Sequence, residues 1–207
     1  MDDTRAALTE LGAATLGESG GRAMRDRIHA AWPGAVLVAP ATPVVCTPGD
    51  NLAIHVAVAS AERGTALVVS VGDVPELGYW GEVLTTGAQS RGIAGLVIDG
   101  GVRDISALER LGFPVFSSTI ALRGATKLRP GSVGAPATVG DVEVAAGDWI
   151  VGDSDGVVVV PGAQLEDVIA AGRARAQKES HMFDQLRAGK TTVELLDLDP
   201  SPITVTR

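Results

Sequence analysis

The chain alternates between short continuous apolar runs and amphipathic stretches. The apolar runs predict strands that are buried on both faces of a sheet, at 66–71 (ALVVSV), 95–99 (GLVID) and 113–117 (FPVFS). The amphipathic stretches predict helices over 82–91, which Gly92 ends, and over 104–111. This alternation favours an α/β layer with parallel strand pairing.

The N-terminal quarter predicts a helix over 4–31 with a break in the glycine-rich segment 17–21. Two strands follow, at 35–38 and 43–47, with a proline turn between them. A helix is then expected from Asp50, a favourable N-cap, to about Glu62. Residues 72–81 are expected to form a loop.

The last third has a different pattern, with short β-prone runs and Gly-Asp turns over 136–160. Pro161 favours the start of a long helix that reaches about Ala188. We therefore predict one domain over 1–190 and a C-terminal arm over 191–207. In an oligomer such an arm often lies on a neighbouring subunit.

Composition narrows the class of protein. The 207 residues are 45% hydrophobic, which is enough for a sizeable core, and carry a formal net charge of −8. The negative charge and the lack of a basic run argue against a nucleic-acid partner. No signal peptide or membrane-spanning run is visible, and Cys46 is the single cysteine. We expect a cytoplasmic protein with no membrane partner.

The candidate chemistry is concentrated between Gly72 and Asp104. A Gly-containing loop leads into the 82–91 helix, whose free N–H groups suit a carboxylate or phosphate. The strand at 95–99 is followed by Arg103 and Asp104, at the strand end where α/β proteins bind ligands. Asp is a hard oxygen ligand for Mg²⁺ or Mn²⁺, and Arg matches a carboxylate. From spacing alone, an ordinary helix start explains this pair better.

Other chemical groups are less informative. The three histidines, His29, His55 and His181, are far apart and form no metal-ligand spacing, so they are interpreted as surface or core residues. No metalloprotease, CxxC, phosphate-loop or serine-hydrolase motif is present.

The segment 81–116 resembles a known family. It contains GE, RG, GLVIDGGVRD and FPVF in the order found in the class II pyruvate aldolases that cleave 4-hydroxy-4-methyl-2-oxoglutarate, a superfamily that includes the RraA-like regulators of ribonuclease E. The similarity continues in PGDNLAIHVA at 48–57, in 140–161 and at Lys178-Glu179. It implies a swivelling β/β/α sandwich with flanking helices, assembled as a homotrimer or homohexamer with active sites between subunits.

The resemblance also implies residue roles. Asp104 would hold the metal, Mg²⁺ or Mn²⁺, and Arg103 would bind the substrate and stabilise charge. The substrate carboxylate would contact Gly81 and the backbone of Glu82, Val83 and Leu84. Glu82 would hold a water beside the metal, and Glu179 of a neighbouring subunit would position a water for proton transfer.

Three positions depart from the family pattern. Glu82 stands where Asp is usual, Trp80 where small residues are common, and Ser118-Thr119 where many relatives have Arg-Gly. The expected activity is metal-dependent cleavage of a 4-hydroxy-2-oxo diacid, of the 4-hydroxy-4-methyl-2-oxoglutarate or 4-carboxy-4-hydroxy-2-oxoadipate type, to pyruvate. Oxaloacetate decarboxylation is the expected side activity. A different 2-oxo acid substrate and a non-catalytic ribonuclease regulator remain alternatives.

Overall fold

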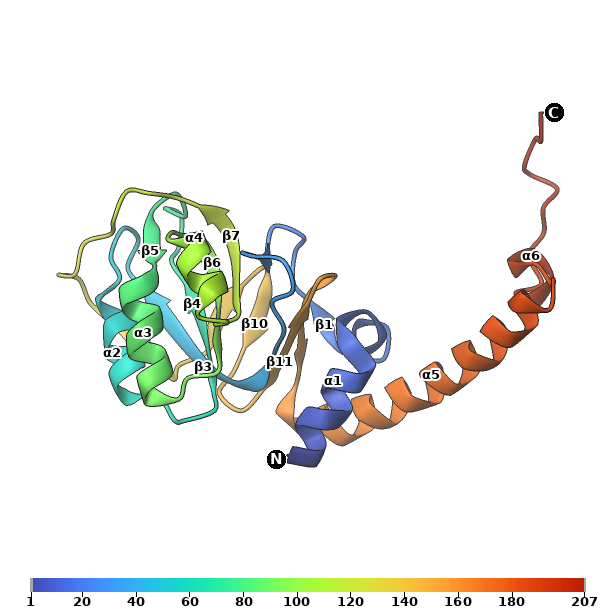
Figure 1. Ribbon diagram of the computed structural model, residues 1–207, viewed down its shortest axis with the longest axis horizontal. Helices are drawn as coiled ribbons and strands as arrows, with labels where there is room; N and C mark the ends of the chain where they lie inside the picture. Colours follow the sequence, from blue (N-terminus) through green and yellow to red (C-terminus); the bar gives the residue numbers. More distant parts are fainter. Residues whose placement is uncertain (1, 207) are drawn as a thin grey trace.

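The computed structural model describes residues 2–206 and is built around a curled ten-stranded mixed sheet (Figure 1). Its strand order is β1-β12-β11-β3-β4-β6-β7-β2, with β5 on β6 and β8 on β3, and β9 and β10 form a separate hairpin. The strands are β1 Arg22–Ala23, β2 His29–Ala30, β3 Leu37–Cys46, β4 Ala66–Ser70, β5 Gly78–Trp80, β6 Gly95–Val102, β7 Val115–Ile120, β8 Gly131–Val133, β9 Ala137–Val139, β10 Val142–Val144, β11 Trp149–Asp153 and β12 Gly156–Val160.

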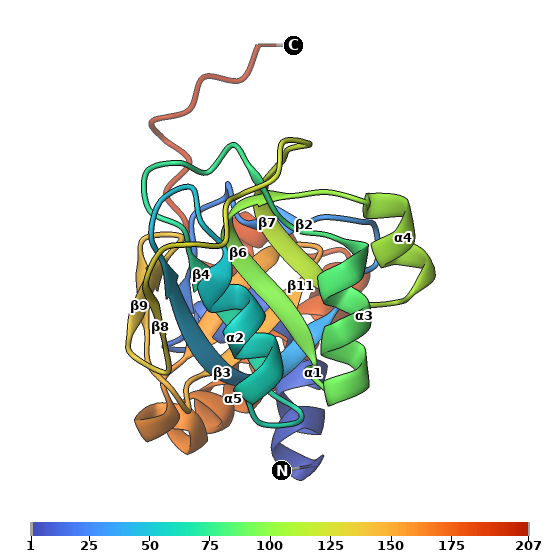
Figure 2. The same cartoon turned by 90° about the vertical axis from the view of Figure 1, so that its left-hand side faces the viewer.

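The helices cover the sheet from two sides. In Figure 2, α2 and α3 lie in front of β3, β4 and β6, and α1 and α5 lie at the β11 side in Figure 1. The helices are α1 Asp2–Gly17, α2 Leu52–Ser60, α3 Glu82–Arg91, α4 Ile105–Arg110, the 3₁₀ turn Gly162–Gln164, α5 Leu165–Arg187 and α6 Thr192–Leu195. No helix within residues 2–206 is long and apolar enough to cross a membrane.

Three apolar clusters follow from this arrangement. Ile54 and Ala57 of α2 and Leu84 of α3 pack on one face of the parallel strands, whose other face is covered by the β9–β10 hairpin. A third cluster joins α1 and the start of α5 to β11 and β12. The parallel strands are thus covered on both faces, as their continuous apolar runs predict.

Several predicted elements are confirmed, among them β4 and the helix over 82–91, which Gly92 ends in the left-handed conformation with a φ of 76°. The predicted break at 17–21 is confirmed, because α1 ends at Gly17, but the helix expected beyond it, to residue 31, is wrong: that segment contains the short strands β1 and β2. Gly20 has a φ of 108°, which lies outside the range of a right-handed helix; Gly12, with a φ of 72°, marks a kink within α1.

Two further predictions are wrong. The strands expected at 35–38 and 43–47 are one continuous strand, β3, and the expected loop 72–81 contains β5. β3 changes partners after Pro40, which is the last residue in register with β11, whereas Ala41 is the first in register with β4. The chain therefore stays extended where a turn was expected.

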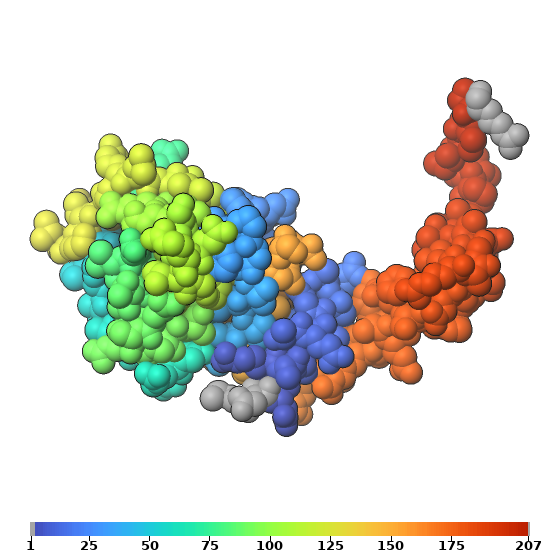
Figure 3. All heavy atoms as spheres, viewed as in Figure 1, coloured from blue at the N-terminus to red at the C-terminus, as the bar shows by residue number. Residues whose placement is uncertain are grey.

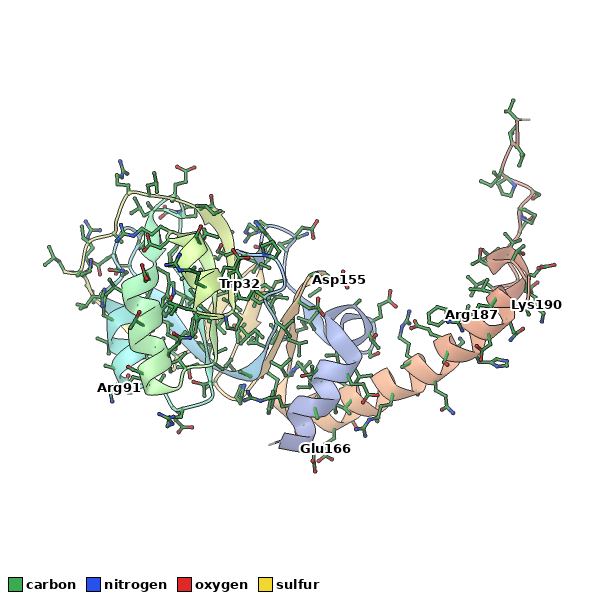
Figure 4. All side chains as sticks on the ribbon, viewed as in Figure 1. Trp32, Arg91, Asp155, Glu166, Arg187 and Lys190 are labelled. Atoms are coloured by element: carbon green, nitrogen blue, oxygen red, sulfur yellow. The ribbon has the colours of Figure 1, made fainter. Side chains whose placement is uncertain are left out.

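The long helix α5 leaves the body of the molecule. Of its 23 residues only Val168 and Gly172 are buried, both near its start, where Gly172 lies close to Leu11 of α1. Figure 3 shows the helix and the following residues projecting from the compact part, and Figure 4 shows Arg187 and Lys190 at its far end. Most of α5 thus has no packing partner within the described chain.

Candidate functional site

Arg103 and Asp104 lie where β6 turns into α4. Asp104 precedes the first residue of α4 in a left-handed conformation, with a φ of 59°. Such a backbone conformation is tolerated best by Gly, Asn and Asp, and it is often associated with function. The turn projects the Asp104 carboxylate toward the start of α3.

The start of α3 is held against this carboxylate. The backbone N–H of Glu82 donates to Asp104 Oδ2 at 2.9 Å. A Cβ atom on Gly81 would lie 2.4 Å from the same oxygen, so a side chain at position 81 would displace the carboxylate. Glycine is therefore required at position 81 because Asp104 occupies the space beside it.

Arg103 is fixed by both its backbone and its side chain. Its backbone N–H donates to Trp80 O at 2.9 Å, and its Nη1 donates to Leu122 O at 3.3 Å. Its Nε lies 3.9 Å from Asp104 Oδ2, at the limit of an ion pair. The guanidinium thus lies beside the carboxylate but keeps donors available for a ligand.

These residues line a cavity of about 240 Å³. Its charged side chains are Arg103, Asp104 and Lys127, which gives an excess of one positive charge. The other lining residues are Asn51, His55, Gly78, Tyr79, Trp80, Gly81, Val83, Leu84, Gly124 and Ala125. A larger hollow of about 620 Å³ beside α1 is lined by the acidic residues Glu18, Asp26 and Asp155, which makes it a poor site for an anionic ligand.

The predicted substrate-binding backbone is only partly available. Gly81, Val83 and Leu84 line the cavity, but the N–H of Glu82 is already bonded to Asp104. The Glu82 side chain is not among the lining residues, and its Oε1 lies 3.8 Å from Arg110 Nη2 of α4. In the single chain, therefore, Val83 and Leu84 offer the first-turn N–H groups to a ligand, and Glu82 faces α4.

A buried carboxylate fixes the opposite wall of the cavity. Asp50 is only 1% exposed and accepts hydrogen bonds from Leu52 N–H, Leu128 N–H, Arg129 N–H and Thr126 Oγ1. Burial alone would raise the pKa of Asp50, but these donors outweigh it and lower the pKa to about 2. Asp50 thereby holds the segment that brings Lys127 to the cavity.

Asn51 and His55 belong to this site although their spacing in the sequence did not indicate it. Both lie at the start of α2 and line the cavity. Burial, followed by the charge of Lys127, lowers the pKa of His55. The one signal was the motif PGDNLAIHVA, which contributed to the family resemblance but not to the predicted site.

Trp80 is a core residue as well as part of the cavity wall. It is 1% exposed, its ring stacks on Phe113 with centroids 5.9 Å apart, and its Nε1 donates to Thr85 Oγ1 at 2.7 Å. The indole therefore supports the wall of the cavity from behind. The third departure, Ser118-Thr119, lies on β7, and neither residue is among the lining residues.

Glu179 does not reach the cavity of its own chain. It lies on α5, where its carboxylate pairs with Arg175 Nε at 2.8 Å, and Arg175 also pairs with Glu18. Figure 1 places α5 on the side of the molecule away from α3 and α4. Any role for Glu179 in the chemistry therefore requires the α5 helix of another subunit.

The fold and site define an α/β protein with a small polar cavity at the carboxyl end of a parallel strand. The family model described as RraA-like, Aldolase/RraA, matches residues 5–159, and the chain belongs to this family. A protein of Halalkalibacterium halodurans, provisionally named 4-hydroxy-4-methyl-2-oxoglutarate aldolase, is 37% identical over 133 residues, covering 64% of this chain and 63% of that protein. An uncharacterized protein of Methanocaldococcus jannaschii is 32% identical over 124 residues, covering 60% of each chain. The matches thus span about three fifths of these relatives.

Solved structures confirm the predicted fold class. An uncharacterized protein from Pseudomonas syringae pv. tomato superposes with a TM-score of 0.80 at 26% identity, covering 92% of this chain and 91% of that one. The RNA-processing inhibitor RraA from Thermus thermophilis superposes with a TM-score of 0.65 at 24% identity, covering 72% and 93%. At 24% identity, the similarity to RraA from Thermus thermophilis shows the fold alone.

Proposed function

We propose that this chain is a metal-dependent lyase that cleaves a 4-hydroxy-2-oxo diacid to pyruvate and also decarboxylates oxaloacetate. The observation that carries the proposal is the pairing of Arg103 and Asp104 in a cavity closed by the first turn of α3. The excess positive charge of the cavity suits a dianionic substrate. The names of the relatives support the aldolase class.

The chain offers a hard-cation ligand in the form of the Asp104 carboxylate. Its Oδ2 accepts from Glu82 N–H, and its Oδ1 remains for a cation. Within residues 2–206 no group of three or more His, Cys, Asp or Glu side chains is arranged to hold a metal. This fits Mg²⁺ or Mn²⁺, which bind through one or two carboxylates and complete their shell with water and substrate oxygens. When bound, such an ion supplies a Lewis acid that stabilises negative charge on an enolate.

Residues of this chain would bind the substrate and stabilise the charge that develops on it. The planar guanidinium of Arg103 would pair with substrate oxygens and stabilise charge that develops during bond cleavage. The N–H groups of Val83 and Leu84, at the positive end of α3, would hold the substrate carboxylate. Cleavage breaks the bond between carbons 3 and 4 and leaves its electron pair on the pyruvate enolate. Loss of CO₂ from oxaloacetate gives the same enolate, so one site serves both reactions.

Protonation of the enolate requires a further acid or base. We assign this role to Glu179 of a neighbouring subunit in a homotrimer or homohexamer, where it would position a water. The projection of α5 from the body supports this part of the proposal, because most of that helix lacks a partner within the described residues of its own chain.

The test is pyruvate release by the purified full chain. With Mg²⁺ or Mn²⁺, we expect turnover of 4-hydroxy-4-methyl-2-oxoglutarate, of 4-carboxy-4-hydroxy-2-oxoadipate or of both, and of oxaloacetate, and we expect a chelator to abolish it. A panel of other 2-oxo acids in the same assay identifies a different substrate. Absence of metal-dependent turnover on all of these would contradict the proposal and favour a non-catalytic binding protein.

A further inference from the structure

Two buried polar atoms beside the candidate site have no hydrogen-bond partner among the described residues. They are Asn51 Oδ1 and His55 Nε2, and both residues line the cavity that contains Arg103 and Asp104. A buried polar atom without a partner costs about 1–3 kcal/mol. Two such atoms in one cavity therefore indicate that a ligand group completes them.

The two residues are positioned to act on one group. Asn51 precedes the first residue of α2, and His55 lies four residues later, one turn along the same face of the helix. Asn51 is 4% exposed, and its Nδ2 donates to Tyr79 O at 2.8 Å. This bond fixes the orientation of the amide, because the reversed amide would place two acceptors together.

The unpaired atoms specify the chemistry of the missing group. Asn51 Oδ1 only accepts, so the ligand must donate a hydrogen. His55 is kept neutral by burial and the nearby Lys127, and a neutral ring with its proton on Nε2 donates one hydrogen. With this tautomer, one hydroxyl group can both donate to Asn51 Oδ1 and accept from His55 Nε2.

We propose that Asn51 and His55 form a subsite for the hydroxyl group on carbon 4 of the substrate, in the same cavity as Arg103 and Asp104. This inference rests on the proposed lyase function and adds to it the feature by which the aldol substrate is distinguished from other 2-oxo diacids. Cleavage requires this hydroxyl, because its oxygen becomes the carbonyl oxygen of the second product and its proton passes to a neighbouring water as the bond between carbons 3 and 4 breaks. Decarboxylation of oxaloacetate does not, because carbon 4 of oxaloacetate is a carboxylate, which has acceptor oxygens but no hydrogen to donate to Asn51 Oδ1.

The two substrates provide the experiment. We compare kcat/KM for a 4-hydroxy-2-oxo diacid and for oxaloacetate in the wild type, Asn51→Ser and His55→Phe. Serine is the replacement for Asn51 because its hydroxyl is still a hydrogen-bond donor, whereas its shorter side chain has no oxygen at the position of Asn51 Oδ1. We expect a fall of about ten- to hundredfold for the aldol substrate in both variants, the worth of one lost hydrogen bond, and a fall of less than about threefold for oxaloacetate in Asn51→Ser.

Two further variants separate recognition from structure. His55→Gln keeps a side-chain donor on α2 and is expected to retain more aldol activity than His55→Phe. His29→Phe, at an exposed position on β2 outside the cavity, is the matched control and should leave the ratio of the two activities unchanged. Circular dichroism and thermal melting identify any variant that does not fold.

Each outcome decides the question. Equal losses on both substrates would overturn the subsite and indicate a structural role for the two residues. Unchanged activity on both would also overturn it and leave an ordered water as the missing partner. Both of these outcomes, with an active wild type, refute the subsite alone. A wild type that decarboxylates oxaloacetate but cleaves no 4-hydroxy-2-oxo diacid would refute the subsite together with the aldolase part of the proposed function, and inactivity on both substrates would refute that function entirely.

Discussion

The Asp104 carboxylate and the backbone N–H of Glu82 are joined by a hydrogen bond of 2.9 Å between residues 22 positions apart. The bond ties the turn after β6 to the first residue of α3 and fixes the orientation of the carboxylate. The Asp104 side chain is thus the proposed metal ligand and also holds the first turn of α3, which would bind the substrate carboxylate. Its consequences can be tested at each end.

At the α3 end, Gly81→Ala is expected to lower activity by about a hundredfold or more. The new Cβ would lie 2.4 Å from Asp104 Oδ2 and push the carboxylate aside. Gly87→Ala in the same helix is the matched control, because its Cβ would meet Val58 Cγ1 at an ordinary 3.5 Å. We expect that control to keep its activity and to melt at the same or a higher temperature. Wild-type activity in Gly81→Ala would show that the position of Asp104 is unimportant.

At the other end, Asp104→Asn should reduce metal-dependent turnover by at least about a hundredfold while the fold is kept. Asparagine tolerates the left-handed backbone and can still accept from Glu82 N–H, so the change removes mainly the negative charge. Metal binding by calorimetry and pyruvate release are the two measurements. Asp141→Asn is the control, since Asp141 also has a positive φ, of 63°, but does not line the cavity. Full activity in Asp104→Asn would contradict the assignment of Asp104 as the metal ligand.

Asp50 gives a prediction for stability against pH. Its pKa is lowered from 3.8 to about 2 in the folded chain. The stabilisation is therefore complete above about pH 4 and is lost as the pH falls toward 2, with a total on the order of 2 kcal/mol. Urea unfolding should show Asp50→Asn to be less stable than the wild type at pH 7, and the gap should narrow between pH 4 and 2. The exposed Asp26→Asn serves as the control. A gap that does not depend on pH would contradict the ionised state of Asp50.

The proposed location of active sites between subunits predicts complementation. Arg103→Ala and Glu179→Ala should each be nearly inactive alone. If the two variants are mixed, dissociated and reassembled, about one site in four combines an intact Arg103 with an intact Glu179 from the neighbour, and activity should recover toward a quarter of the wild type. Differently tagged variants verify that mixed assemblies form. Mixed assemblies that stay inactive, or a fully active Glu179→Ala, would rule out the shared site.

The elements predicted most accurately from the sequence are those that depend on residues adjacent in the chain. The helix over 82–91 is bounded by Gly81 and Gly92, and β4 is a continuous apolar run, so neighbouring residues alone determine both. The segment over 22–30 is extended because it pairs with β12 and β7, which lie far away in the sequence. Met24 and Ile28 are buried as their apolar character suggests, but in the irregular segment between β1 and β2 instead of on a helix.

The same distinction applies to the site. Arg103 and Asp104 were identified because they are adjacent and follow a predicted strand. Asn51 and His55 were missed because the cavity wall they form depends on β5, which itself was taken for a loop, and on the segment that Asp50 anchors. A histidine without ligand spacing gives no signal until such contacts are known.

The contact between Gly81 and Asp104 also constrains how this chain can change over generations. A side chain at 81 is incompatible with the carboxylate in its observed position, whereas loss of the carboxylate at 104 would free that space. The two positions are therefore expected to vary together, and descendants that abandon the chemistry should be recognisable by a larger residue at 81. The residues at positions 81 and 104 would then distinguish relatives that keep the proposed metal ligand from relatives that have lost it.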